Sequence, residues 1–262
     1  MNLDLNGKKA IVCGSTQGLG FASAAELALL GADVTLMARN EEKLKAVVKK
    51  LPMSKKQKHQ YIVADFQNPQ FVKDSIDKYL AEENKINILV NNTGGPKGGD
   101  ITKATAEEFL QAFNTHLICN QILVQAALPL MKSSGYGRIV NIISTSVKEP
   151  INGLGVSNTI RAAVASWSKT LANEVGQFGI TVNNVLPGST RTARYDSIIK
   201  NLANKNEESE MDAEKRMVDS IPLKKIGSPE DFGAVVAFLC SPAASYITGI
   251  NLPVDGGRLH SL

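Results

Sequence analysis

Short apolar runs alternate with helical patterns along almost the whole chain, and this alternation is the strongest constraint on its fold. The runs are nearly continuous in apolar residues, which is typical of strands buried on both faces of a parallel sheet. Because crossovers between parallel strands are right-handed, the helices between them cover both faces. The seven expected strands span residues 9–13, 33–37, 61–64, 86–90, 138–143, 180–185 and 250–254. The expected helices include 18–30, 41–50 and 106–131.

No Pro-, Ser- or Gly-rich linker divides the chain, so residues 1–262 are expected to form one doubly wound α/β domain of the Rossmann type. Residues 190–219 differ from the rest, because they are polar and indicate two helical pieces without a strand. Ligands in such folds bind outside the carboxyl ends of the strands. We therefore interpret 190–219 as a flap over a binding cleft, with a solvated surface insertion as the alternative.

Composition excludes several classes of protein. Hydrophobic residues make up 43% and charged residues 21%, so the chain has the apolar content of an ordinary globular domain and not that of a disordered protein. No segment approaches the roughly 20 uncharged apolar residues of a membrane span. The first residues lack the basic stretch and apolar run of a secretion signal. We expect a cytoplasmic protein with no membrane partner.

The charge and the cysteines add two exclusions. The net charge of +4 is spread along the chain, and aromatic residues are only 5%, which favours solvated surface over a nucleic-acid partner. Cys13, Cys119 and Cys240 are far apart, without a CxxC pair or a Cys/His cluster. We therefore expect no metal site and no disulfide, but three small buried side chains.

A glycine-rich turn stands where the first strand passes into the first helix. It reads Gly14-Ser15-Thr16-Gln17-Gly18-Leu19-Gly20. Glycines allow a tight turn and let a diphosphate approach the helix N-terminus, where free N–H groups and the helix dipole favour an anion. After the first strand of a doubly wound pattern, such a turn indicates a dinucleotide site.

These motifs resemble the short-chain dehydrogenase/reductase family over essentially the whole chain. The resemblance rests on the turn 14–20, on Asn91-Asn92-Thr93-Gly94, on Asn114, on Ser144, on Pro187-Gly188, and on the segments 246–249 and 254–257. Within that family the chain is most similar to 3-oxoacyl-acyl-carrier-protein reductases. The resemblance implies hydride transfer between a nicotinamide cofactor and a small molecule, and a homo-oligomer, either dimer or tetramer.

The end of the second strand indicates which cofactor is used. An acidic residue there accepts hydrogen bonds from a free ribose 2′-hydroxyl, whereas arginine suits a 2′-phosphate. The strand ends Leu36-Met37-Ala38-Arg39 without a carboxylate, which favours NADP(H), although Gln17 stands where many NADP-preferring relatives carry a base. The cofactor-binding residues implied by the resemblance are Gly14, Ser15, Gln17, Gly18, Leu19, Gly20, Arg39, Asp65, Phe66, Asn92, Thr93, Gly94, Pro187, Gly188 and Thr192.

The Tyr-x-x-x-Lys pair of most family members is missing. Alignment of the helix that follows Ser144 places Ser157 at the tyrosine position and Arg161 at the lysine position. None of the five tyrosines has a lysine four residues later, although Tyr195 lies in the flap. An aliphatic hydroxyl ionises too far above the working pH to be an efficient acid. A guanidinium, with a pKa above about 12, holds a ribose but relays no proton.

The remaining candidate catalytic residues are Ser144 and Asn114, with Lys148 four residues after the serine. A lysine at the cleft protonates or stabilises an oxyanion, although Lys148 could equally be a solvent-exposed neighbour of Glu149. Lys97, in a glycine-rich loop, is the second candidate.

Three functions stay open at this point. The first is NADPH-dependent reduction of a small carbonyl compound of the 3-oxoacyl-thioester or ketone type. The second is conjugate reduction of an enone, because Gly94-Gly95, Lys148-Glu149-Pro150 and the Ser157-Asn158 stretch resemble olefin reductases. The third is a non-catalytic NADP(H)-binding sensor or scaffold.

Overall fold

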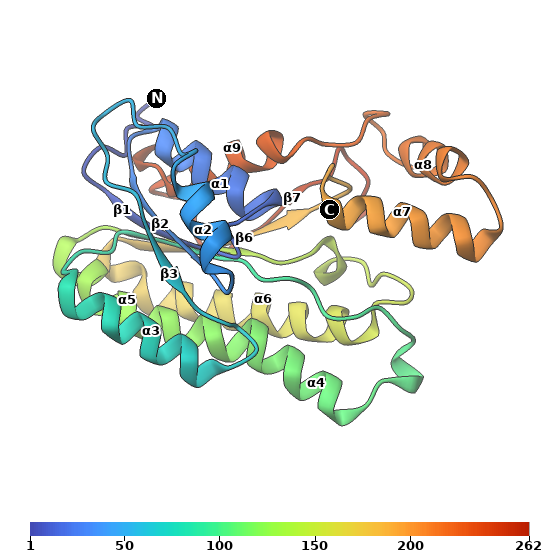
Figure 1. Cartoon of the computed structure of the whole chain (residues 1–262), viewed down its shortest axis with the longest axis horizontal. Helices are drawn as coiled ribbons and strands as arrows, with labels where there is room; N and C mark the ends of the chain where they lie inside the picture. Colours follow the sequence, from blue (N-terminus) through green and yellow to red (C-terminus); the bar gives the residue numbers. More distant parts are fainter. Residues whose placement is uncertain (262) are drawn as a thin grey trace.

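The computed structural model describes residues 1–261, and they form a seven-stranded sheet with helices on both faces (Figure 1). All strand pairs are parallel, and the spatial order is β3-β2-β1-β4-β5-β6-β7. The strands are β1 (Lys9–Cys13), β2 (Asp33–Ala38), β3 (Gln60–Val63), β4 (Ile88–Asn91), β5 (Gly137–Ile142), β6 (Ile180–Pro187) and β7 (Asn251–Val254). The doubly wound prediction is confirmed, and no expected strand bound is off by more than two residues.

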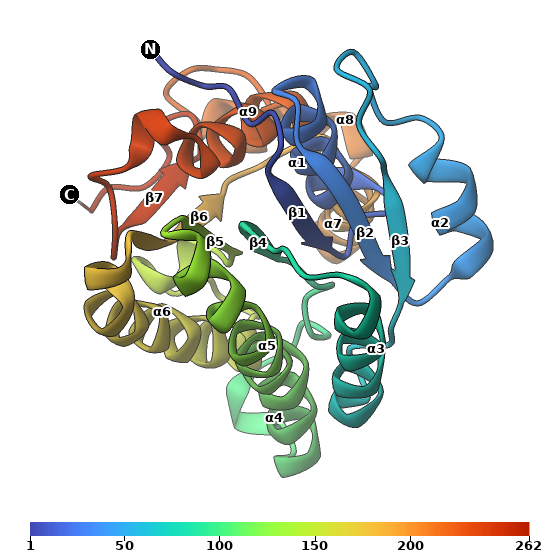
Figure 2. The ribbon, with the colours of Figure 1, turned by 90° about the vertical axis from the view of Figure 1, so that its left-hand side faces the viewer.

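The helices divide into two layers (Figure 2). Helices α1, α2 and α9 pack on one face, around Leu27, Leu44 and Phe232, whereas α3, α5 and α6 pack on the other. The α-helices are α1 (Gly18–Leu29), α2 (Glu41–Val48), α3 (Pro69–Glu82), α4 (Ala106–Phe113), α5 (Cys119–Ser134), α6 (Gly155–Val175), α7 (Ala193–Asn206), α8 (Glu210–Asp219) and α9 (Pro229–Cys240). The chain leaves β1 in one direction to reach β3 and returns to β4 on its other side, which creates the switch point where such folds bind ligands.

The helix expected over 106–131 is not uniform. Helix α4 passes into a π-helical turn, η2 (Asn114–Ile118), before α5 continues to Ser134. A π turn holds one extra residue, so it changes which side chains face the sheet, and such turns are frequent at functional sites. Short 3₁₀ turns are η1 (Ile101–Lys103), η3 (Thr145–Val147), η4 (Gly176–Phe178) and η5 (Pro242–Ala244).

Residues 190–219 form the two expected helical pieces, α7 and α8, without a strand. Figure 1 shows them beyond the end toward which β6 points. They pack on each other through a small core of their own, made by Tyr195, Ile199, Ala203 and Ala213. Their role as a flap over a binding cleft stays a prediction, and residues 190–219 are called the flap below.

The three cysteines are buried, as the sequence analysis expects. Cys13, Cys119 and Cys240 are all free and buried, and burial raises the pKa of each thiol. In the part of the chain that the structure describes, no helix is long and apolar enough to cross a membrane, and no His, Cys, Asp and Glu side chains gather into a metal-binding group.

Four asparagines form a ladder of side-chain amides across the second half of the sheet. Asn91 donates to Asn141 (2.8 Å), Asn141 to Asn184 (3.0 Å), and Asn184 to Asn251 (2.8 Å). These residues are Cα partners in the strand register, so the ladder fixes β4, β5, β6 and β7 against slippage. Asn141 also donates to the Ser168 hydroxyl of α6 (3.2 Å).

We predict that Asn141→Ala lowers the free energy of unfolding by about 2–4 kcal/mol, because it leaves buried amides on both neighbouring strands unpaired. Asn251→Ala, at the exposed end of the ladder, should cost less than about 1 kcal/mol, since water replaces the lost amide. Urea unfolding of both variants measures the difference. Equal losses would show that the buried ladder contributes nothing beyond a surface hydrogen bond.

Candidate functional site

Side-chain hydrogen bonds fix the glycine-rich turn against the end of β4. The Asn92 side chain donates to the carbonyl oxygens of Cys13 (3.3 Å) and Gly14 (3.1 Å). A Cβ on Gly20 would stand 2.3 Å from the Gly14 carbonyl oxygen, and one on Gly14 would stand 2.6 Å from the Asn92 carbonyl oxygen. Gly14 also has a φ of +57°, in the left-handed region that favours glycine. The turn therefore requires glycine at both positions.

The turn also leaves the start of α1 open for an anion. Gln17 is the N-cap residue, and its side chain caps no N–H group of the helix; the first turn carries no acidic residue. Ser15 is buried and accepts a hydrogen bond from the Met37 N–H (3.1 Å), which ties the turn to β2. Free N–H groups at the positive end of a helix dipole fit a phosphate. The cradle thus fits the diphosphate of a dinucleotide.

The structure spreads the other expected nucleotide contacts around this cradle. Arg39 is exposed one residue after β2. Asp65 lies beyond β3 and accepts from the Gln67 N–H (3.0 Å), whereas the Phe66 side chain packs into the core. Thr192 caps α7 and lies over the turn, with its methyl carbon 3.5 Å from where a Cβ on Gly18 would stand. Strand, turn and flap therefore meet at one cleft.

The catalytic candidates of β5 and α6 lie near each other. Ser144 follows β5, and its hydroxyl oxygen accepts from the Ser146 N–H (3.0 Å). Ser157 is half-buried in the first turn of α6. Arg161, one turn later, is 7% exposed and donates to the Ile142 carbonyl (3.0 Å), which places its guanidinium at the end of β5. Lys148 is half-buried in the turn after η3, with its N–H on the Thr145 carbonyl (3.0 Å).

Asn114 and Tyr195 are placed differently from the other candidates. Asn114 begins the π turn and is half-buried, and within residues 1–261 its side chain makes no hydrogen bond to the other candidates. Tyr195 is 4% exposed and packs in the core of the flap, with the Arg191 guanidinium 5.1 Å from its ring centroid. Burial raises the pKa of its phenol. Tyr195 therefore serves the packing of the flap rather than the cleft.

His116 is a site residue that sequence reasoning missed. It lies in the π turn, is 2% exposed, and its Nδ1 is 2.6 Å from the Thr93 hydroxyl oxygen. Burial, and then the nearby charge of Arg161, lower its pKa to about 2. The imidazole is neutral at every working pH, so it is a fixed hydrogen-bonding group. The threonine at position 93, where the family motif carries alanine, was the available signal.

Arg161 is a buried cation. Burial, and then the charge of Arg194 in the flap, lower its pKa to about 10, below the value above 12 that its residue type predicts. The guanidinium keeps its charge at neutral pH. Arg194 was also missed from sequence; its Nη2 lies 3.6 Å from the point where a Cβ on Gly95 would stand.

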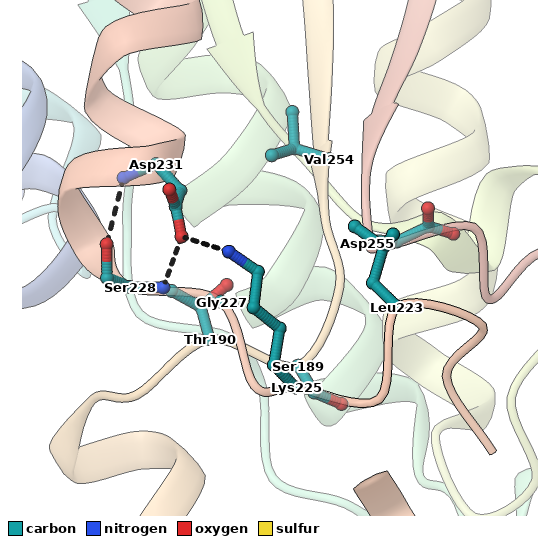
Figure 3. Close-up of a pocket in the computed structure, with 10 residues that line it drawn as sticks. Ser189, Thr190, Leu223, Lys225, Gly227, Ser228, Asp231, Val254 and Asp255 are labelled. Carbon is teal, nitrogen blue, oxygen red and sulfur yellow. Dashed lines mark hydrogen bonds and ion pairs between the residues drawn. The ribbon is translucent and has the colours of Figure 1, made fainter. Parts of the chain in front are cut away.

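Two cavities flank the cleft. One, of about 490 Å³, is lined by the loop Gly94–Lys97, by α4, and by His116 and Val156. A smaller one, of about 210 Å³, lies where the flap returns to α9 and β7 (Figure 3). There Lys225 approaches Asp231 (3.9 Å), which also accepts from the Ser228 N–H, and no candidate catalytic residue lines this cavity. Of the catalytic candidates, Lys97 lines the larger cavity, and Ser144, Asn114, Lys148, Ser157 and Arg161 line neither.

Comparison with known proteins gives the family. Residues 14–258 match the family model described as Enoyl-(Acyl carrier protein) reductase. A 3-oxoacyl-[acyl-carrier-protein] reductase FabG of Rickettsia bellii is 35% identical over 259 residues, covering 98% of this chain and 99% of the relative. The chain belongs to the short-chain dehydrogenase/reductase family. The resemblance read from its motifs is confirmed.

Other members of this family share its whole length. The NADPH-dependent reductase BacG of Bacillus subtilis is 29% identical, covering 97% of this chain and 99% of that protein. Among solved structures, L-sorbose reductase of Gluconobacter frateurii, complexed with NADPH and L-sorbose, matches with a TM-score of 0.93 at 29% identity over the full length of both chains. YwfH, an NADPH-dependent reductase involved in bacilysin biosynthesis, has a TM-score of 0.91 at 28% identity, covering 97% and 99%. This short-chain dehydrogenase/reductase is therefore an oxidoreductase by family.

The buried, neutral His116 predicts a pH dependence of stability. The folded state keeps the imidazole neutral below pH 6.5, where the unfolded chain binds a proton. As the pH falls below 6.5, the free energy of unfolding therefore decreases by on the order of 1 kcal/mol per pH unit because of this group. Urea unfolding at pH 7.5 and pH 5.5 should show a smaller pH effect in His116→Asn than in the parent.

His260→Asn is the matched control, since His260 is exposed. It should leave the parent's pH effect unchanged. An identical pH effect in His116→Asn and the parent would contradict the neutral buried state.

Proposed function

We propose that this chain is an NADP(H)-dependent reductase that transfers hydride to a small carbonyl-containing substrate. The observation that carries the proposal is the open cradle at α1, formed by glycines that tolerate no Cβ, with Arg39 exposed at the tip of β2. Two of the relatives are NADPH-dependent reductases by name, and a third is a structure with NADPH bound. We assign the cytoplasm as its location, in keeping with three free cysteines.

Different residues around the cradle contact different parts of the nucleotide. The N–H groups of the turn hold the diphosphate, and Arg39 holds the 2′-phosphate. Asn92, Thr93 and Gly94 lie along the ribose, and Thr192 reaches the nicotinamide end from the flap. When bound there, NADPH supplies the hydride.

Ser144 and Lys148 act on the substrate oxygen. Because the Ser144 hydroxyl oxygen already accepts from Ser146, its own proton is left to donate to a carbonyl. Lys148 leaves the same strand end and stabilises the oxyanion as hydride arrives. Arg161, buried behind Ser157, adds a fixed positive charge. His116 is too weak a base to exchange protons and instead orients Thr93.

Conjugate reduction of an enone is the second candidate, and the small side chain at Ser157 favours it. Hydride addition to the alkene carbon leaves an enolate, which needs positive charge near its oxygen more than a phenolic proton donor beside it. Arg161 and Lys148 meet that need. A protein that binds NADPH but oxidises it with no 3-oxoacyl thioester, ketone or enone would instead be a sensor or scaffold.

We further propose a homo-oligomer, dimer or tetramer. The expected contact helices carry exposed apolar side chains, among them Leu110 (61% exposed) and Phe113 (38%) on α4. Isolated apolar side chains are ordinary at a surface, whereas neighbouring ones one turn apart on a helix mark a contact face.

Lys148→Ala should reduce turnover of NADPH with the best ketone or enone by about a hundredfold or more, while the dissociation constant for NADPH stays unchanged. Steady-state NADPH oxidation and titration of NADPH fluorescence measure the two quantities separately. Lys97→Ala is the matched comparison, as the second lysine of the cleft. A loss confined to Lys97→Ala would transfer the role to the glycine-rich loop.

Arg39→Asp should reverse the cofactor preference. The charge-assisted contact to the 2′-phosphate is worth about 1.5–3 kcal/mol, so NADPH affinity should fall by roughly ten- to a hundredfold. NADH affinity should rise, because the new carboxylate accepts from the 2′-hydroxyl. Arg39→Gln, as control, should weaken NADPH without improving NADH. Unchanged affinities in Arg39→Asp would remove residue 39 from the site.

A further inference from the structure

Two arginines from different parts of the fold lie near the carboxyl ends of β4 and β5. Arg161 comes from α6 and is buried. Arg194 comes from the first turn of α7, in the flap, and its guanidinium reaches across to Gly95 in the loop after β4. Its charge is felt at Arg161, where it opposes protonation. Arg161 binds the carbonyl of Ile142, the last residue of β5, and Arg194 lies beside the loop that follows β4. Because β4 and β5 are neighbouring parallel strands, both guanidinium groups lie at the same edge of the sheet.

Within residues 1–261, neither guanidinium forms an ion pair with an acidic side chain. Within residues 1–261, the arginine ion pairs are Arg191 with Glu214 and Arg216 with Glu208. Among these described residues, Arg161 donates one side-chain hydrogen bond, to the Ile142 carbonyl, out of the five that a guanidinium can donate. A buried cation beside a second cation is unfavourable unless an anion joins them.

Within residues 1–261, another arginine of the flap is paired with an acidic side chain, whereas Arg194 is not. Arg191, three residues before Arg194, is paired with Glu214 and stacks on Tyr195. Arg194 is exposed and unpaired within residues 1–261, although Asp196 stands in the same helical turn. A positive side chain in the first turn of a helix is repelled by the positive end of the helix dipole. An anion bound there is attracted by that dipole and by the side chain.

The acidic residues of the neighbouring cavity do not fill this role. Glu107 and Glu108 line its outer side on α4. The Glu108 carboxylate is used in the capping box of α4, where it accepts from the Thr105 N–H (3.0 Å). The other residues that line the cavity, Gly95 and His116 among them, carry no carboxylate.

We propose that Arg194 and Arg161 recognise a carboxylate of the substrate, so that the natural substrate is a small oxo acid or enone acid rather than a neutral ketone. This proposal rests on the proposed reductase function and narrows its substrate class. Arg194 binds the carboxylate directly, as a planar donor that matches two carboxylate oxygens. Arg161 is the buried charge behind it. The cofactor's phosphates are served elsewhere, by the turn at α1 and by Arg39.

Matched pairs of compounds test the proposal. Acetoacetate, levulinate and 4-oxo-2-pentenoate are each compared with their methyl esters on the NADP(H)-loaded protein. Binding is followed by fluorescence of bound NADPH or by calorimetry with NADP⁺, and turnover by NADPH oxidation. The parent should bind at least one acid about tenfold or more tightly than its ester.

Arg194→Gln should abolish that preference, with ester binding, NADPH affinity and melting temperature unchanged. Arg194→Lys should restore part of it, because the charge returns without the planar fork. Lys200→Gln, which removes one charge from an exposed position of the same helix, should leave the preference intact.

The outcomes separate this proposal from the reductase function. Acid binding that is lost in Arg194→Gln, without NADPH oxidation by any compound, would keep the carboxylate site and reject the reductase. Turnover of acids and esters at equal rates, unaffected by Arg194→Gln, would keep the reductase and reject the carboxylate site. The carboxylate site is also rejected if no acid binds better than its ester, or if Arg194→Gln weakens NADPH itself by the same factor.

Discussion

The buried amide ladder is the interaction on which the geometry of the cleft depends. Its inner end, Asn91, is the last residue of β4, and the next two residues make hydrogen bonds at the cleft. Asn92 holds the glycine-rich turn shut, and Thr93 holds His116. Because the ladder locks β4 to β5 and β6 in register, the position of the cofactor cradle and that of Ser144 are set by one rigid set of hydrogen bonds.

The electrostatics of the cleft follow from burial more than from the number of charges. Burial keeps His116 neutral, although it lies beside Thr93 in a polar cleft, and Arg161 stays charged because a guanidinium holds its proton even when its pKa falls to about 10. A histidine of low pKa and an arginine are compatible neighbours, whereas two readily titrating cations would not be. At neutral pH, Arg161 is therefore charged and His116 is neutral.

The fold and the cofactor cradle could be predicted from the sequence because their signals are local. Continuous apolar runs mark the strands, and the turn is marked by Gly14 and Gly20, where a Cβ would clash with backbone oxygens. The substrate side could not be predicted in the same way. The π turn shifts the helix after Asn114, so 3.6-residue spacing does not show that His116 faces Thr93 and Arg161. Arg194 meets Gly95 only through folding of the flap, over a separation that no spacing rule covers. The sequence does show an asparagine within each of several apolar strands. Only the strand register shows that the four asparagines of the ladder lie side by side.

In the site that we propose, Ser157 and the two arginines are parts of one change in chemistry relative to the Tyr-x-x-x-Lys pair. Tyrosine and lysine at positions 157 and 161 would provide a proton beside the reacting carbonyl. Serine and arginine provide space and a permanent charge instead, and Arg194 extends that charge into the flap. In the proposed site, Arg194 would hold a substrate carboxylate away from the reacting carbon, and binding energy from that contact can be used to orient the carbon toward the hydride. Orientation and electrostatic stabilisation then carry the reaction, and the demand for a strong proton donor falls most for a substrate whose product is a stabilised enolate.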